Sequence, residues 1–412
     1  MSTAKKEKTG TEIETGKNNG RKAVPEKIKN GLRKIKRLLG RILRKIRSRK
    51  LYTVLAIVAV IAVLVLLAGL AIRYIFPAAK GFTVEEDASF TDPVDAGDPD
   101  LNEQIDMLSE LRASGDLFDL LKGWAQTDTG NSLMQSKDVI NVLLVGVDAS
   151  GGNSDAIMLA SVNKKNSTIT LSSIMRDSYT FMDTPVGEAA GKINAAYANG
   201  GMECLIDTVQ NDYKIKIDHY FCVNFRTFVE VVDIIGGVAV PVKDYERRAM
   251  NGLAEWNSEY LYESGDSVLL NGRQALLYCR IRKYDEDGDV SRTRRQRQFM
   301  TALINAAKEL TASDLPDLAK TLHKYVSTDC AVAQLVSLGT QALSGKWYRY
   351  NITSLSYPLP ENRMDYSGHA WVWIVDYPAD AKAMQEQIYG TSNIQLSEDR
   401  RTAMDIVRSG EF

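Results

Sequence analysis

Hydrophobic and polar positions along the chain predict one membrane helix followed by an α/β domain. The run LYTVLAIVAVIAVLVLLAGLAI, residues 51–72, has no charged residue over 22 positions. As a helix it spans roughly 33 Å, enough for a hydrocarbon core of about 30 Å. A cleaved signal peptide, the competing interpretation, has an apolar segment of about 7–15 residues and then a small-residue cleavage site. Arg73, Tyr74 and Phe76 follow this run instead. We therefore predict an uncleaved transmembrane helix within residues 51–76.

Beyond residue 138 the pattern switches repeatedly between strand and helix periods. The near-continuous apolar run VINVLLVGV, residues 139–147, predicts a strand buried on both faces. Further strands are predicted at 167–174, 218–225, 238–242, 354–360 and 369–377. Helices are predicted at 193–213 with a Gly-Gly break, 225–237, 271–282, 291–310, twice within 314–344, and at 379–389. Such alternation indicates an α/β fold, a three-layer αβα domain over about 137–392.

The segments flanking this domain have different patterns. Residues 77–100 are rich in Asp, Glu, Pro and Ala, which is typical of a solvated stalk. Leucines at roughly helical spacing over 101–121 predict accessory helices, so that 77–136 is an acidic stalk with accessory helices. Residues 393–412 are interpreted as a C-terminal tail.

Charge is distributed unevenly along the chain. Residues 1–50 hold 18 Lys and Arg against 4 Asp and Glu, while the whole chain has a net charge of −1. The positive-inside rule then places this basic head in the cytoplasm and residues 77–412 outside the cell membrane. Within the head an apolar stripe at helical spacing predicts an amphipathic helix on the anionic inner leaflet. Its members are Ile28, Leu32, Ile35, Leu39, Ile42 and Ile46. A solvated basic tail and a nucleic-acid-binding tail are the alternatives.

Cysteine and histidine use excludes some classes of site. Cys204, Cys222, Cys279 and Cys330 show neither CxxC nor zinc spacing. Three disulfide pairings, or free buried thiols, remain open. Three histidines in the chain disfavour a His-rich metal site and a His-based triad.

A loop after the first predicted strand carries two carboxylates. In GVDASGGNSD, the strand delivers Asp148 to its C-terminal edge, where α/β sheets place ligands, and a Gly-Gly loop returns Asp155. Two carboxylates are hard oxygen ligands suited to Mg²⁺ or Mn²⁺. Alternatively, Asp155 caps the following segment and Asp148 makes a turn.

Two further clusters carry positive charge. Arg176 ends a strand in SSIMRDSY and Lys192 precedes a helix, where each either pairs with a carboxylate or faces an anionic ligand. The run YCRIRKYDEDGDVSRTRRQRQ contains seven basic residues within 280–297. They are Arg280, Arg282, Lys283, Arg292, Arg294, Arg295 and Arg297. Arginine forks bind phosphate oxygens bidentately, although a solvated helix paired with the acidic residues of the same run is the alternative. Nucleic acid is disfavoured because this part is predicted to be extracytoplasmic.

In this order and spacing, the motifs resemble the LytR-CpsA-Psr (LCP) family of cell-envelope proteins. The matching elements are GVD…NSDAIML, SSIMRDSY, KINAAYANGG, DHYFCVNF, VDIIGGVAV, LNGRQALLYCRIR and GDVSRTRRQRQ. The resemblance implies a Mg²⁺-dependent phosphotransferase in a Gram-positive type envelope. Its donor would be a glycopolymer, such as wall teichoic acid or capsular polysaccharide, on a polyprenyl-pyrophosphate carrier, and its acceptor peptidoglycan. A polyprenyl-pyrophosphate hydrolase and a non-catalytic, membrane-bound envelope regulator are the alternatives.

The resemblance also implies roles for individual residues. Asp148 and Asp155 correspond to the metal-binding aspartates. The pyrophosphate-contacting positions are Arg176, Lys192, Arg280, Arg282, Arg292 and Gln296. Asp289, Arg292 and Arg176 are the expected catalytic residues, with Asp289 accepting the proton of the acceptor hydroxyl. Two departures from the family pattern are Asn153, where Arg is frequent, and Met175, where Pro is frequent.

Overall fold

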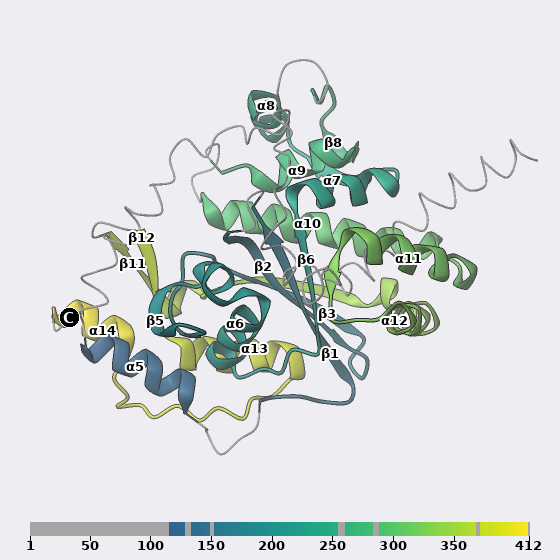
Figure 1. Cartoon of the computed structure of the whole chain (residues 1–412). Helices are drawn as coiled ribbons and strands as arrows, with labels where there is room; N and C mark the ends of the chain where they lie inside the picture. Colours follow the sequence, from purple (N-terminus) through teal and green to yellow (C-terminus); the bar gives the residue numbers. More distant parts are fainter. Residues whose placement is uncertain are drawn as a thin grey trace, which may run out of the picture. The chain divides into compact units, whose positions relative to one another are not determined.

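The structure is a computed structural model that describes residues 115–127, 133–148, 152–253, 260–282, 288–367 and 371–410 (Figure 1). The predicted basic head, the predicted transmembrane helix and the stalk as far as residue 114 lie outside the described residues. Among the residues that are described, no helix combines the length and apolar character needed to cross a membrane.

A six-stranded mixed sheet is the central element, with strand order β10-β3-β2-β1-β6-β9. Its strands are β1 (Val139–Val147), β2 (Ser154–Asn163), β3 (Thr168–Ile174), β6 (His219–Asn224), β9 (Ser327–Thr328) and β10 (Asn351–Tyr357). β1 runs antiparallel to β2 and parallel to β6, and β3 runs antiparallel to β2 and parallel to β10. Because β1 and β6 are parallel and Val147 pairs with Asn224, both strands end at the same edge of the sheet.

Three two-stranded antiparallel sheets accompany the central sheet in the described part of the chain. They are β4 (Tyr179–Thr184) with β5 (Gly187–Lys192), β7 (Val238–Val242) with β8 (Gly265–Leu270), and β11 (Arg363–Ser367) with β12 (Trp371–Val375). The predicted strand at 238–242 therefore exists but belongs to a two-stranded sheet, whose strands are separated in sequence by α8, and not to the central sheet.

Helices cover both faces of the sheet, as the predicted αβα layering requires (Figure 1). One group in mutual contact is α5 (Gly115–Gln126), α6 (Ala195–Tyr213), α13 (Tyr377–Tyr389) and α14 (Ala403–Ser409). The other is α7 (Phe225–Ile234), α8 (Asp244–Leu253), α9 (Gly272–Arg280), α10 (Asp289–Ala306), α11 (Leu315–Tyr325) and α12 (Val332–Ser344). Short 3₁₀ helices are η2 (Ala307–Glu309), η3 (Ala312–Asp314), η4 (Trp347–Arg349) and η5 (Pro360–Asn362). Because both faces are covered, seven of nine β1 residues are buried, as the apolar run predicts.

Two glycine features shape the helices around the site. Gly200 and Gly201 interrupt α6 with non-helical backbone angles, which agrees with the predicted Gly-Gly break. At Gly272, the first residue of α9, an added Cβ would lie 2.3 Å from the carbonyl oxygen of Val229 in α7. Only glycine permits this close approach, which brings α9 against α7.

The packed body extends beyond the predicted bounds of 137–392. On the N-terminal side α5 packs on α6, and on the C-terminal side α14 packs on α5 and β12. Ile406 and Val407 of α14 are buried in the common core. The segment interpreted as a tail thus contributes a core helix, because its apolar residues face one side of a single helix of two turns.

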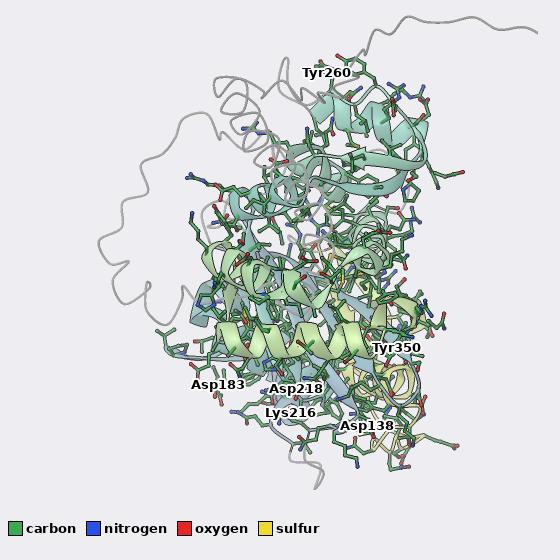
Figure 2. All side chains as sticks on the ribbon, turned by 90° about the vertical axis from the view of Figure 1, so that its right-hand side faces the viewer. Asp138, Asp183, Lys216, Asp218, Tyr260 and Tyr350 are labelled. Atoms are coloured by element: carbon green, nitrogen blue, oxygen red, sulfur yellow. The ribbon has the colours of Figure 1, made fainter. Side chains whose placement is uncertain are left out.

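The two ends of the sheet differ in what surrounds them. Asp138 precedes β1, while Lys216 and Asp218 precede β6, and all three lie toward the lower end of the view in Figure 2. Tyr260, which follows the undescribed segment after α8, lies at the upper end of the same view. The carboxyl ends of β1 and β6 point away from the Asp138 end, and the candidate site begins there.

Candidate active site

Asp148 occupies the turn directly after β1. Its carboxylate accepts the backbone N–H of Gly152 at 2.9 Å and that of Asn153 at 3.4 Å, and its own N–H donates to the Asn153 carbonyl at 3.2 Å. The turn suggested as an alternative is thus present. The turn and the metal-binding role are compatible, because one carboxylate can accept backbone N–H groups and bind a cation at the same time.

Asp155 lies within β2 and forms an ion pair with Arg176. The register pairs Ile157 with Ile174, and continuing it by two residues on each strand brings Asp155 opposite Arg176. The Arg176 Nη1 group donates to the Asp155 carboxylate, and both side chains are largely buried. Asp155 is therefore part of a strand and not a cap of the following segment, and the buried Arg176 lies beside its carboxylate.

Asp177 is a site residue that the sequence analysis did not assign. Its carboxylate lies 2.7 Å from Lys192 Nζ, at the end of β5, and 3.6 Å from Arg176 Nε. Burial acts to raise the pKa of Asp177, but the charges of Arg176, Lys192 and Arg292 together lower it below the ordinary value. Lys192 thus reaches the site through Asp177. The signal available in the sequence was the position of Asp177 directly after Arg176.

The start of α10 contributes a second carboxylate with two arginines. Asp289 is the first residue of α10, and its Oδ1 lies 2.6 Å from Arg292 Nη2 and 3.7 Å from Arg282 Nε. Nε of Arg292 is buried and has no hydrogen-bond partner among the described residues. A buried guanidinium with an unused donor is suited to an incoming anion, because one bound oxygen would satisfy it.

Electrostatics join these clusters into one site. Burial lowers the pKa of Arg292 to about 10, Asp289 opposes that shift, and the positive charges of Arg176 and Arg282 add to it. Asp155 also acts on Arg292 in the opposing direction. The residues after β3, within β2 and at the start of α10 therefore act on one another, although up to 137 positions separate them in the sequence.

An apolar cavity of about 230 Å³ opens at these charges. Most of its lining is apolar and comes from β1, β2, β6, α7, α9 and α10. Among the apolar lining residues are Leu144, Val145, Met158, Val223, Phe225, Phe228, Leu276, Leu277, Phe299 and Met300. Its charged and amide lining residues are Asp155, Arg280, Arg282, Arg292, Asn224 and Gln296. The Arg280 guanidinium also lies over the Phe225 ring, 4.5 Å from its centroid, a cation–π contact at the border between charge and apolar wall.

The predicted site residues are therefore brought together to different degrees. Five line the cavity directly, namely Asp155, Arg280, Arg282, Arg292 and Gln296. Arg176 and Lys192 join through the carboxylates of Asp155 and Asp177, and Asp289 joins through Arg282 and Arg292. Asp148 is in the turn before β2 and does not line the cavity.

Other arginines of the basic run have structural partners. Arg295 is fully buried, with Nε 2.8 Å from Glu246 Oε1 and Nη1 donating to the Ile281 carbonyl at 3.0 Å. Arg297 donates to the Ser356 hydroxyl at 2.6 Å. The basic run of the sequence thus divides into arginines that face the cavity and arginines that hold α10 against its neighbours.

The four cysteines are all buried and none forms a disulfide. This agrees with the free buried thiols left open above. Burial, the main influence, raises the pKa of Cys222 and of Cys279 to about 12, so both remain protonated thiols at neutral pH.

Comparison with known proteins identifies the family. The family model described as "LytR_cpsA_psr family" matches residues 117–388, which is more than half of the chain. The chain belongs to the LytR-CpsA-Psr family. This confirms the resemblance inferred from the motifs.

Individual members show how far the similarity extends. A curated relative from Halalkalibacterium halodurans, named polyisoprenyl-teichoic acid--peptidoglycan teichoic acid transferase TagU, is 37% identical over 184 residues. That alignment covers 43% of this chain and 57% of the relative, so the chain spans less than two thirds of the relative's length. The solved structure of Bacillus subtilis TagV has a TM-score of 0.51 at 26% identity, covering 62% of this chain and 98% of TagV. A structure of TagT bound to LIIa-WTA has a TM-score of 0.50 at 25% identity, covering 62% of this chain and 91% of TagT.

Proposed function

We propose that this LytR-CpsA-Psr protein transfers a glycopolymer from a polyprenyl-pyrophosphate carrier to peptidoglycan through a phosphodiester link. The observation that carries the proposal is a group of three arginines, the buried Arg292 and the half-buried Arg280 and Arg282, that line an apolar cavity. A polyprenyl-pyrophosphate donor fits both parts of this site, since its charged pyrophosphate suits the arginines and its apolar tail suits the cavity wall. The relatives named teichoic acid transferases act on the corresponding class of polymer. Teichoic acid is accordingly the first donor to test, and capsular polysaccharide the second.

The basic residues of the site are proposed to bind and orient the pyrophosphate. Arg280, Arg282 and Arg292 line the opening of the cavity, and Arg176 is held beside it by Asp155. In water-excluded surroundings such donors stabilise the negative charge that develops when a phosphorus atom is attacked. Gln296, whose side chain donates to the Cys279 carbonyl at 3.4 Å, adds an amide to the same wall. Positioning and electrostatic stabilisation by these side chains are the main contributions of the protein.

Asp289 is proposed to accept the proton of the acceptor hydroxyl. Both of its oxygens are buried without a hydrogen-bond partner among the described residues, apart from the ion contacts with Arg292 and Arg282. One oxygen is therefore available for a hydroxyl group. Proton acceptance by a positioned carboxylate typically contributes about 10²–10⁴-fold to a rate.

The carboxylates fit the Mg²⁺ expected from the sequence. Asp148 and Asp155 are hard oxygen ligands of the kind that Mg²⁺ binds; Asp148 follows β1, and Asp155 lies at the start of β2, which pairs with the end of β1. A bound Mg²⁺ would neutralise charge on the pyrophosphate oxygens. Mn²⁺ has the same ligand preference and is the alternative ion.

The proposed location follows from residues 1–76. A single membrane helix would keep the N-terminus in the cytoplasm and hold the catalytic domain outside the cell membrane, where peptidoglycan is. Nucleic acid is therefore not an expected partner of the catalytic domain.

The proposal is tested with the full chain purified in detergent, a polyprenyl-pyrophosphate-linked glycan and a peptidoglycan oligomer. Mass spectrometry should detect a phosphodiester-linked product in the presence of Mg²⁺, and its loss on adding EDTA. Arg292→Lys should reduce the rate by about 10²–10³-fold, as expected for one lost donor to developing charge. The matched control is Arg226→Lys on α7, whose side chain is 72% exposed.

Two outcomes would contradict the transfer reaction. Release of polyprenyl phosphate at the same rate without peptidoglycan would identify a hydrolase. No product in either case, from a folded protein with its lipid donor bound, would favour the non-catalytic regulator.

A further inference from the structure

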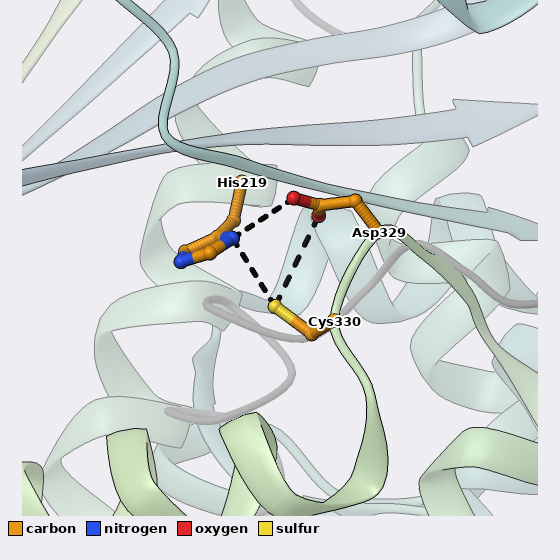
Figure 3. A group of neighbouring side chains, drawn as sticks. All are labelled: His219, Asp329 and Cys330. Carbon is orange, nitrogen blue, oxygen red and sulfur yellow. Dashed lines mark hydrogen bonds and ion pairs between the residues drawn. The ribbon is translucent and has the colours of Figure 1, made fainter.

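A second cluster of chemically reactive side chains lies away from the candidate active site. His219 begins β6, and Asp329 and Cys330 directly follow β9 (Figure 3). β6 and β9 are antiparallel neighbours, with Phe221 opposite Thr328, so the start of β6 lies beside the residues that follow β9. Asn224, at the other end of β6, lines the cavity, and five residues of strand correspond to about 17 Å. The cluster is thus separate from the site of the proposed reaction.

The three side chains converge on one small volume. His219 Nδ1 lies 2.9 Å from Asp329 Oδ2 and 3.2 Å from Cys330 Sγ, and Sγ lies 3.9 Å from Asp329 Oδ1. One ligand atom from each residue lies within 4.8 Å of the other two. For zinc bonds of about 2.0–2.3 Å, the corners of a tetrahedron are about 3.3–3.8 Å apart. The two separations from Nδ1, 2.9 Å and 3.2 Å, lie within about 0.4 Å of this range. The distances from Nδ1 and Sγ to Asp329 are to different oxygens of its carboxylate, so a small rotation of that group brings one oxygen to the shared position.

The geometry does not suit a Cys-His-Asp catalytic triad. In a triad the imidazole uses one ring nitrogen for the nucleophile and the other for the carboxylate. Here both Cys330 and Asp329 approach the same nitrogen of His219, and the second ring nitrogen lies on the far side of the ring (Figure 3). Convergence of S, N and O on one point is instead the arrangement that a shared cation requires.

We propose that His219, Asp329 and Cys330 form a binding site for Zn²⁺, separate from the Mg²⁺ site of the proposed reaction. Its protein ligands are the imidazole Nδ1, one carboxylate oxygen and the thiolate, and water takes the fourth position beside the exposed Asp329. A borderline-soft cation with tetrahedral preference is indicated by the mixed N, O and S donors, which Mg²⁺ does not use. Binding releases the proton of the Cys330 thiol and any proton on Nδ1 of His219.

Surrounding backbone contacts hold the ligands in place. Asp329 Oδ1 accepts the backbone N–H of Tyr220 at 3.1 Å, and the Thr328 hydroxyl accepts the backbone N–H of Cys330 at 2.9 Å. Such outer contacts orient metal ligands and reduce the entropy lost on binding. The cation would join β6 to β9, a strand of two residues at the edge of the sheet. Its expected effect is therefore to stabilise that edge.

The test uses Co²⁺ alone as a spectroscopic probe on the chelator-treated full chain in detergent. We expect one Co²⁺ per chain, a thiolate-to-cobalt absorption in the near ultraviolet and the intense visible bands of tetrahedral Co²⁺, all displaced by Zn²⁺. Cys330→Ser should remove the thiolate band, and Asp329→Asn should weaken binding by about tenfold or more. Cys204→Ser and His323→Gln are the matched controls, because they change a cysteine and a histidine outside the cluster and should leave the spectrum unchanged.

A wild-type protein with a cooperative melting transition and no thiolate band would overturn the proposal, whatever the variants do. So would a thiolate band that persists in Cys330→Ser or disappears in Cys204→Ser. If Cys330→Ser fails to fold, Asp329→Asn decides instead, since its side chain is partly exposed, and an unchanged affinity in that variant would reject the site. None of these measurements depends on transferase activity.

Discussion

Arg295 offers a direct test of how the arginines of α10 divide between stability and turnover. It is fully buried, and its partner Glu246 is almost fully buried as well. In Arg295→Met the Glu246 carboxylate loses the partner at 2.8 Å and the Ile281 carbonyl loses its donor at 3.0 Å. Removing one member of a buried ion pair leaves an uncompensated charge and typically costs about 3–5 kcal/mol.

The expected result is a clear loss of thermal stability. At about 2 °C per kcal/mol for a domain of this size, the melting temperature should fall by roughly 6–10 °C. Near-ultraviolet circular dichroism on the full chain in detergent follows the transition, with Trp347 as a fully buried reporter. The control is Arg226→Met, an exposed i,i+4 pair with Glu230, which should change stability by about 0–1 kcal/mol.

A double variant separates the lost charge pair from lost packing. Glu246→Gln removes the charge but keeps an oxygen for the Lys243 backbone N–H that Glu246 Oε2 accepts at 2.8 Å. Combined with Arg295→Met it should recover at least half of the lost stability, because no buried charge is left unpaired. A melting temperature within about 2 °C of wild type in Arg295→Met would refute the reasoning, since it implies a cost near 1 kcal/mol or less.

Arg292, one helical turn earlier, should behave in the opposite way. Burial lowers the pKa of Arg292 to about 10, and the neighbouring Arg176 and Arg282 add to that shift. Because the pKa of Arg292 is lower in the folded than in the unfolded protein, folding disfavours its charged form. This cost to the stability of the folded protein is fully present at every pH below the folded pKa. Unlike Glu246 in Arg295→Met, Asp289 keeps a second arginine, Arg282, at 3.7 Å when Arg292 is removed. Arg292→Met should therefore leave the melting temperature unchanged or raise it, while transfer falls by about 10²–10³-fold. Loss of folding in Arg292→Met would show that its role is structural.

Three further predictions concern the metal, the donor lipid and pH. Asp155→Ala should abolish Mg²⁺-dependent transfer while the circular dichroism spectrum is kept, and wild-type activity would contradict the metal assignment. The protein made in bacteria should carry a polyprenyl phosphate or pyrophosphate, which mass spectrometry of a lipid extract would detect. Met158→Trp places a larger side chain in the cavity and should reduce the amount of bound lipid. An active protein without isoprenoid would count against a lipid-binding cavity. Burial raises the pKa of Asp380 to about 7 from 3.8, so the folded state binds the extra proton in this interval and stability falls as pH rises from about 4 to about 7. Asp380→Asn should flatten this dependence and melt higher than wild type at about pH 8, whereas a parallel pH profile in both proteins would show that another group is responsible.

Local pattern was sufficient for much of the central sheet. Runs that are apolar over their whole length, as in β1, have to be buried, and helices ending at glycine pairs, as in α7, have visible boundaries. β2 was not predicted, because Asp155 at its start was interpreted as a loop residue. Arg176 compensates the Asp155 charge from the neighbouring strand, which lets a carboxylate remain inside a sheet. That compensation depends on strand register and is not visible within a short window of sequence.

The arginines of α10 show a similar limit. Arg292, Arg295 and Arg297 are all buried, yet only Arg292 lines the cavity. What separates them is the partner that each meets, and Glu246, which pairs with Arg295, comes from a helix 49 positions earlier. A count of positive charge in the run therefore predicts an anion site, as the motifs did, but cannot assign each arginine.

The His219 cluster extends this argument to metal chemistry. A search by spacing tests ligands that are close in sequence, and the four cysteines and three histidines fail that test. His219 and Cys330 are nevertheless brought to 3.2 Å by the pairing of β9 with β6, across 111 positions. A sheet edge can thus assemble a mixed donor set from single residues, as short spaced motifs do within one loop. If Co²⁺ binds there with a thiolate ligand, a low number of cysteines and histidines in a sequence is not sufficient reason to exclude a zinc site.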